Sequence, residues 1–254
     1  MPITEWNELA EWWNQELGDE GDLWHRTFLD PALFAAVGPV EGLRVLDVAC
    51  GNGHNTRRLA RMGATVTAVD VSEGIIEINR RREEREPLGI TYLAADAANL
   101  APLPDGSFDL AVSHMGLMDI PDAAGAIREM GRILHPGGRF LALISHPCFD
   151  IPAHSGWVWE KAGLEATAWR KLRRYAAPFE APIYWHKDGG TIQTMAYHRP
   201  ISWYVRAIRN AGMVLTGMDE PTPGEEFIAR QQPDGAWMTD VPLHIIFEAK
   251  KIAV

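Results

Sequence analysis

The sequence predicts a doubly wound α/β fold, and three observations support that prediction. Short runs rich in Val, Leu and Ile alternate with helical runs between residues 43 and 145. A glycine turn at 51–53 separates the first of these strands from the helix that follows it. The alternation resumes after residue 200. Because strands that alternate with helices pair in parallel through right-handed crossovers, we expect an open, mostly parallel sheet with helices on both faces.

Hydrophobic spacing places the elements in chain order. Trp and Leu residues recur every three or four positions across 5–17, which predicts an amphipathic helix there. Core strands are expected at 43–48, 65–70, 90–95, 108–113 and 138–145, and core helices at 54–62, 73–86 and 122–134. A helix at 201–211 and strands at 213–219 and 243–250 follow. The loop 221–242 between the last two strands has no helical pattern, which suggests an antiparallel hairpin at one edge.

We expect a single domain with three parts. These are an N-terminal helical segment (1–40), a core (41–145 and 200–254) and an inserted cap (146–199). The cap is assigned because its residues contain several prolines and four of the ten tryptophans without a clear alternation of strand and helix. The basic run 169–175 within it is expected to be a solvated helix face, with a patch for an anionic acceptor or RNA as the alternative.

Composition narrows the classes of partner. The formal net charge of −10 repels a phosphate backbone, so we do not expect a nucleic-acid partner. Only Cys50 and Cys148 occur, which excludes a dense disulfide framework and a four-cysteine zinc site, and we expect no metal. No apolar stretch is long enough for a membrane span, and residues 1–17 do not resemble a signal peptide. We therefore expect a cytoplasmic protein, monomeric or homodimeric, without a membrane partner.

Polar and small residues follow four of the predicted strands at the edge where ligands of open parallel sheets bind. The first group is the turn after strand 43–48, where glycine permits close approach of a ligand to the backbone. Asp70 ends the next strand and can accept two hydrogen bonds from a ribose diol. The predicted cofactor-binding residues are Asp47, Ala49, Gly51, Gly53, Asp70, Val71, Asp96, Ala97, Ser113 and His114.

The spacing of the glycines distinguishes two classes of cofactor. A dinucleotide fold favours a third small residue after the two glycines, because the pyrophosphate lies against the start of the helix. Here that position is Thr56, which is β-branched. S-adenosylmethionine has no pyrophosphate and therefore fits the turn better than NAD.

The chain resembles the class I S-adenosylmethionine-dependent methyltransferases, on motifs between residues 43 and 145. The segments that carry the resemblance are VLDVACGNG (45–53), Val69-Asp70, Ala95-Asp96-Ala97, LPDGSFDL (103–110) and ILHPGGRF (133–140). The resemblance implies a seven-stranded sheet whose last strand is antiparallel. It also implies that the methionine moiety binds near Asp47, Gly51 and Gly53, the ribose at Asp70, and the adenine at Val71 and Asp96. Segments 197–202 and 219–221 are similar to members that act on small molecules.

The expected reaction is methyl transfer to a small, aromatic or heterocyclic acceptor. If the acceptor must lose a proton, histidine suits pH 7, and the candidates are His146 first, then His114 and His198, with His154 and His186 behind them. The cap aromatics are expected to enclose the acceptor: Trp157, Trp159, Trp169, Trp185, Tyr175, Tyr184 and Tyr197. The alternatives are a nicotinamide-dependent oxidoreductase and a non-catalytic S-adenosylmethionine-binding protein.

Overall fold

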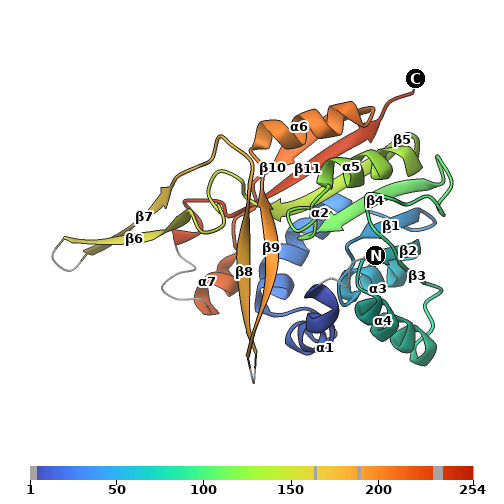
Figure 1. Cartoon of the computed structure of the whole chain (residues 1–254), viewed down its shortest axis with the longest axis horizontal. Helices are drawn as coiled ribbons and strands as arrows, with labels where there is room; N and C mark the ends of the chain where they lie inside the picture. Colours follow the sequence, from blue (N-terminus) through green and yellow to red (C-terminus); the bar gives the residue numbers. More distant parts are fainter. Residues whose placement is uncertain (1–4, 163–164, 188–189, 231–236, 254) are drawn as a thin grey trace.

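A seven-stranded sheet forms the centre of the computed structural model, which describes residues 5–162, 165–187, 190–230 and 237–253. Its strands, in chain order, are β1 (Arg44–Val48), β2 (Thr65–Asp70), β3 (Thr91–Ala94), β4 (Phe108–His114), β5 (Leu134–Ser145), β10 (Met213–Asp219) and β11 (His244–Lys251). Their order in space is β10–β11–β5–β4–β1–β2–β3 (Figure 1). The order in which strands are added to the sheet therefore reverses between β1 and β4, which is where open α/β sheets bind their ligands.

Strand β11 is the one that runs against its neighbours. It pairs antiparallel with both β10 and β5, whereas the pairs β1–β2, β1–β4, β2–β3 and β4–β5 are parallel. The predicted mostly parallel sheet with an antiparallel last strand is thus confirmed, and so is the hairpin at one edge. The loop of that hairpin differs from the prediction because it contains a short helix, α7 (Glu225–Arg230). Its Phe227 is fully buried in the hydrophobic core, which explains why so short a helix forms.

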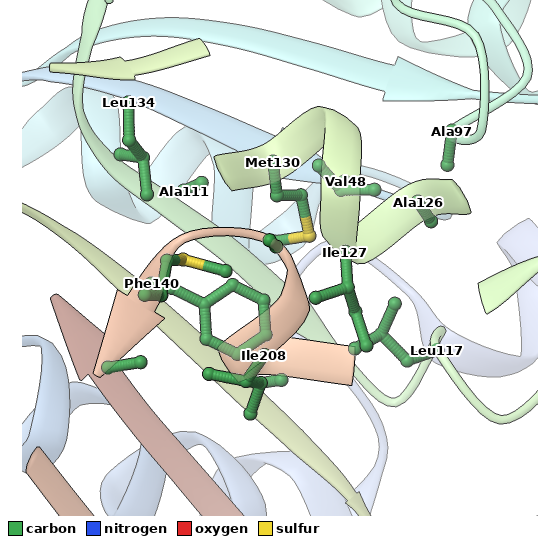
Figure 2. Packing of buried hydrophobic residues seen from close by; sticks show 14 of the residues in the cluster. Val48, Ala97, Ala111, Leu117, Ala126, Ile127, Met130, Leu134, Phe140 and Ile208 are labelled. Atoms are coloured by element: carbon green, nitrogen blue, oxygen red, sulfur yellow. The ribbon is translucent and has the colours of Figure 1, made fainter. Parts of the chain in front are cut away.

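Helices cover both faces of the sheet. They are α1 (Glu5–Leu17), the π-helical turn η1 (His25–Leu29), α2 (Asp30–Val37), α3 (His54–Arg61), α4 (Glu73–Arg85), α5 (Ala123–Ile133) and α6 (Ile201–Asn210). Residues of α5 and α6 share one buried cluster, and residues of α2, α3 and α4 share the other. Figure 2 shows the first cluster, where Met130 and Ile127 of α5 pack near Phe140 of β5 and Ile208 of α6. The two-sided burial agrees with the nearly continuous apolar runs of the central strands.

Two helix starts are fixed by side-chain caps close to the edge of the sheet. The Ser72 hydroxyl accepts a hydrogen bond from the Ile75 N–H at the start of α4. The Asp122 carboxylate accepts one from the Gly125 N–H at the start of α5. Such caps satisfy N–H groups that the helix leaves unpaired, each typically worth about 1 kcal/mol. They hold the loops after β2 and β4 in place, and both loops contribute to the cavity described below.

The described residues between 155 and 198 contain two antiparallel hairpins, where the sequence showed no clear alternation. The first pairs β6 (Ser155–Ala162) with β7 (Glu165–Leu172), and the second pairs β8 (Phe179–Lys187) with β9 (Gly190–His198). The prediction of a helix face at 169–175 is wrong, because most of that run lies in β7. Figure 1 shows β6–β7 extending away from the sheet, while β8–β9 passes beside α1, with which β9 is in contact.

Two smaller points complete the description. Strand β5 begins at Leu134 rather than at 138, because Leu134 pairs with Phe108 ahead of a shift in register. Among the residues that the structure describes, no helix has the length and apolar character that crossing a membrane requires.

Candidate functional site

A cavity of about 420 Å³ opens at the carboxyl ends of β1, β2, β3 and β4. Eight of the predicted cofactor-binding residues line it: Asp47, Ala49, Gly51, Asp70, Val71, Asp96, Ala97 and His114. The structure thus brings together residues from four strand ends, as a parallel sheet requires. Gly53 and Ser113 are not among the lining residues. Further lining residues come from α1, from the loop after β4 and from the β8–β9 hairpin.

Asp70 is held at the end of β2 by backbone donors on both sides. Its Oδ2 accepts a hydrogen bond from the Gly51 N–H at 3.0 Å, and its Oδ1 accepts one from the Ser72 N–H at 3.0 Å. Burial raises the pKa of Asp70, although these backbone hydrogen bonds lower it. The carboxylate therefore joins the glycine turn after β1 to the loop after β2 and presents its remaining lone pairs to the cavity.

Asp47 is the second buried carboxylate of the cavity. The Thr56 hydroxyl donates to its Oδ2 at 2.6 Å, and both side chains are almost fully buried. Burial raises the pKa of Asp47 to about 6, the Thr56 hydrogen bond lowers it, and the charge of Asp70 raises it. The structure gives Thr56 a role of its own, since it orients Asp47 from the first turn of α3.

Positive φ angles make the turn between β1 and α3 tight. Ala49, Gly51 and Gly53 have φ values of 58°, 53° and 74°. A Cβ on Gly53 would lie 2.8 Å from Asn79 Oδ1, so this glycine is needed for the packing of α3 on α4. Gly53 therefore shapes the turn through its contact with α4 and is not itself a lining residue of the cavity.

The acceptor side of the cavity is aromatic, but its residues differ from those expected. Trp6 and Trp13 of α1 face Trp185 of β8, with ring centroids 5.1 Å apart for Trp13 and Trp185, and Tyr197 of β9 also lines the wall. The remaining cap aromatics do not line the cavity: Trp157, Trp159, Trp169, Tyr175 and Tyr184. The expected enclosure is therefore only partly confirmed, and the N-terminal helix completes it.

His114 is the one of the three predicted catalytic histidines that lines the cavity. His146 is buried and does not line the cavity. Its Nε2 lies 2.8 Å from Glu220 Oε1, and its Nδ1 accepts from the Cys148 N–H. His198 is also buried, with Nε2 2.9 Å from the Tyr175 carbonyl oxygen. Neither residue lines the cavity. His154 and His186 do not line it either.

Several titratable residues of the cavity wall were not predicted from the sequence, among them His25, His54 and Asp119. His25 and His54 lie close to His114, and Asp119 lies in the loop after β4. Burial raises the pKa of Asp119 to about 7, although the charge of Arg199 lowers it. His54 directly follows the glycine motif, and Asp119 follows a strand end, so position gave a signal for both. Nothing local distinguished His25.

Comparison with known proteins establishes the family. Residues 46–142 match the family described as "Methyltransferase domain". The crystal structure of an S-adenosylmethionine dependent methyltransferase from Mesorhizobium loti is 30% identical, with a TM-score of 0.74. The match covers 92% of this chain and 100% of that one. This chain belongs to the S-adenosylmethionine-dependent methyltransferases, as the motifs predicted, and S-adenosylmethionine is the cofactor that its family and its structural relatives share.

Two curated relatives have more specific names. A demethylmenaquinone methyltransferase of Renibacterium salmoninarum is 39% identical over 127 residues, which are 50% of this chain and 49% of the relative. A fatty-acid O-methyltransferase of Mycolicibacterium smegmatis is 34% identical over 182 residues, 71% of this chain and 58% of the relative. The chain spans about half the length of the curated relatives it matches. The comparisons give no support to the nicotinamide alternative.

The donors of S-adenosylmethionine match the acceptors of the cavity. Two buried carboxylates, Asp47 and Asp70, both have raised pKa values because burial disfavours their charge. A ribose diol offers two hydroxyl donors, and a methionine ammonium offers a positive charge with three donors. Ligand groups of this kind relieve such desolvated acceptors, because a buried carboxylate is stabilised by donors and cations. The cavity residues therefore fit the cofactor.

Proposed function

We propose that this chain transfers a methyl group from S-adenosylmethionine to a small, mainly apolar, aromatic or heterocyclic molecule. The observation that carries the proposal is the position of Asp70, which lines the same cavity as Trp6, Trp13 and Trp185. One cavity thus has a polar side suited to the cofactor and an aromatic side suited to an acceptor. Methyl transfer needs this juxtaposition, because its rate depends on holding two reactants at attack distance without water.

The polar side would hold the cofactor through the residues at the strand ends. Asp70 would accept the ribose hydroxyls, and Asp47 would face the methionine ammonium. Val71 and Ala97 would contact the adenine, with Asp96 accepting from its amino group. The bound cofactor supplies a methyl group on a sulfonium centre, which is reactive enough that the protein needs few catalytic side chains.

The acceptor side supports an aromatic substrate. Trp13 of α1 and Trp185 and Tyr197 of the β8–β9 hairpin all line the cavity. Aromatic surfaces of this kind stack on planar molecules and exclude water. The named substrates of the two curated relatives, a demethylmenaquinone and a fatty acid, are both apolar. We infer an acceptor with a hydroxyl or another proton-bearing nucleophile on an apolar body.

We place the proton acceptor at Asp119. Its carboxyl lines the cavity, and desolvation brings its pKa to about 7, where it can take a proton from the acceptor at neutral pH. His146 and His198 are poor candidates because their rings lie outside the cavity and their nitrogens are engaged elsewhere.

We also propose that residues 146–199 act as the cap of a single domain. Its β8–β9 hairpin contributes Trp185, Met195 and Tyr197 to the cavity, whereas the β6–β7 hairpin contributes none of the lining residues. The basic run in β7 does not favour a nucleic-acid acceptor, because Arg170 is engaged by Asp150 and by the Phe149 carbonyl oxygen.

Radiolabelled S-adenosylmethionine tests the proposal. The purified chain is incubated with the methyl-labelled cofactor and a bacterial extract separated into small molecules, RNA and protein. We expect label in the small-molecule fraction, none with Asp70→Ala, and unchanged transfer with the exposed control Arg173→Ala. Label confined to RNA or protein, or absent from every fraction, would overturn the proposal.

A further inference from the structure

Three histidines from distant parts of the chain meet in the wall of the cavity. His25 begins η1, His54 begins α3, and His114 ends β4. One nitrogen of each ring lies within 4.8 Å of one nitrogen of the other two. Their side chains are 13%, 8% and 7% exposed, so all three are largely withdrawn from water. Three buried imidazoles stabilise one another little when they are neutral and repel one another when they are charged, so their proximity calls for a partner that binds them together.

The hydrogen bonds behind two of these rings fix their tautomers. His25 Nδ1 lies 2.7 Å from Asp22 Oδ1, and His54 Nδ1 lies 2.9 Å from Asn52 Oδ1. The orientation of the Asn52 amide is set, because its Nδ2 donates to the Gly18 carbonyl oxygen and its Oδ1 accepts from the His54 N–H. Both Nδ1 atoms must therefore carry the proton. The Nε2 atoms keep their lone pairs, which is the arrangement that metal-binding histidines require.

The Nε2 atom of His54 lies against another acceptor. It is 3.3 Å from Asp30 Oδ2, and the Asp30 side chain is 3% exposed. His114 Nε2 is 3.8 Å from the other oxygen of the same carboxylate and has no hydrogen-bond partner among the described residues. His114 Nδ1 accepts from the Asn55 amide at 3.1 Å, so a neutral His114 carries its proton on Nε2, and a metal ion that binds there displaces that proton. The lone pair of His54 Nε2 and the Asp30 carboxylate repel each other in this buried position unless a positive charge lies between them. Either a proton on His54 or a bound cation supplies it.

We propose that His25, His54 and His114 bind a divalent transition-metal ion, with the Asp30 carboxylate compensating its charge. Imidazole ligands suit Zn²⁺, Fe²⁺ or Co²⁺ rather than Mg²⁺ or Ca²⁺, which prefer oxygen. Three protein ligands leave a coordination position open, as in catalytic sites, and all three histidines line the cavity. An oxygen or nitrogen atom of the acceptor can occupy that position. The site goes beyond the proposed methyl transfer and does not depend on it.

Metal binding is measured directly on the tag-free chain after dialysis against a chelator, without S-adenosylmethionine. Co²⁺ is titrated while its visible absorption is recorded, and Zn²⁺ is then added as a competitor. We expect one Co²⁺ per chain, with an absorption typical of nitrogen ligation that Zn²⁺ abolishes. His54→Ala and His114→Ala should weaken binding by on the order of 100-fold. The control His186→Ala, an exposed histidine of β8, should bind as the wild type does.

Two results would overturn the site. One is a wild-type spectrum no stronger than that of the His54→Ala chain, which would mean that a proton on His54 supplies the positive charge. The other is full binding in every variant, which would place the ion elsewhere. Thermal unfolding of each variant identifies loss of folding, and His54→Gln then replaces His54→Ala. Because the titration contains no cofactor, its failure leaves the methyl-transfer proposal standing.

Discussion

The two sides of the cavity are built in different ways. The cofactor side comes from residues 47–97, a continuous stretch in which Asp47, Asp70 and Asp96 lie at or just beyond the carboxyl ends of β1, β2 and β3. The acceptor side joins Trp13 of α1 to Trp185 of β8, two residues far apart in the sequence that meet with ring centroids 5.1 Å apart. The comparison suggests that the cofactor side is set by the fold itself, whereas the acceptor side can vary with the segments attached to it.

The largest expected effect is on the cofactor side, where Asp70→Ala should weaken cofactor binding. The variant removes the proposed acceptor of two ribose hydroxyls, and hydrogen bonds to a charged group are each worth about 1.5–3 kcal/mol. We expect the affinity for S-adenosylhomocysteine to fall roughly 1000-fold, or about 4 kcal/mol. Calorimetry measures it, with the exposed Asp240→Ala as control. Retained affinity would show that the ribose binds elsewhere.

Asp119→Asn should affect the chemical step rather than cofactor binding. Arg199, Tyr197 and Tyr204 carry the other titratable groups around this carboxyl. Because only the carboxylate can take a proton, the wild-type kcat should rise as pH increases through about 7. The variant should lose that rise and about 100-fold in kcat at pH 8. A pH profile with the same rise in both chains would contradict this role.

Trp185→Ala compared with Trp169→Ala should separate the two hairpins. Trp185 lines the cavity, whereas Trp169 is 56% exposed on β7. Loss of the first ring should raise KM for the acceptor about tenfold, the value of one aromatic contact with its buried area. Loss of the second should leave KM unchanged. Steady-state kinetics at saturating cofactor gives both values, and equal effects would refute the distinction.

The smallest expected effect is a proton released at Asp47. Its pKa of about 6 lies above the ordinary value of an aspartate, so at pH 6 much of the carboxyl is protonated in the free chain. A methionine ammonium beside it favours the charged form and lowers that pKa. Cofactor binding should therefore release a fraction of a proton at pH 6 and almost none at pH 8. Calorimetry in buffers of different ionisation enthalpy detects the release, and Asp47→Asn should abolish it.

The same contrast explains what the sequence could predict. The strands, the helices and the strand-end residues depend on local patterns of hydrophobicity and on glycine, which a single sequence displays. Asp70 and Asp47 were therefore identified. The contact of Trp13 with Trp185 depends on how a hairpin packs against a helix, and no local pattern encodes it. Trp157 and Trp159 lie in the same predicted cap as Trp185, yet their hairpin extends away from the sheet (Figure 1).

The histidines show the limit most clearly. His146 follows a strand end, as the predicted catalytic residues should, but its ring turns toward Glu220. His25 carries no motif at all and reaches the cavity because η1 packs beside α3. Side-chain direction at a loop is set by its tertiary partners, which a single sequence does not reveal.

Cofactor binding tests the central claim most directly. The wild-type chain is titrated by calorimetry with S-adenosylhomocysteine and, separately, with NAD. We expect S-adenosylhomocysteine to bind one-to-one. NAD should neither bind nor displace it, because Thr56 orients Asp47 at the position where a dinucleotide fold has a small residue beside the pyrophosphate. Binding of NAD with no binding of S-adenosylhomocysteine would contradict it.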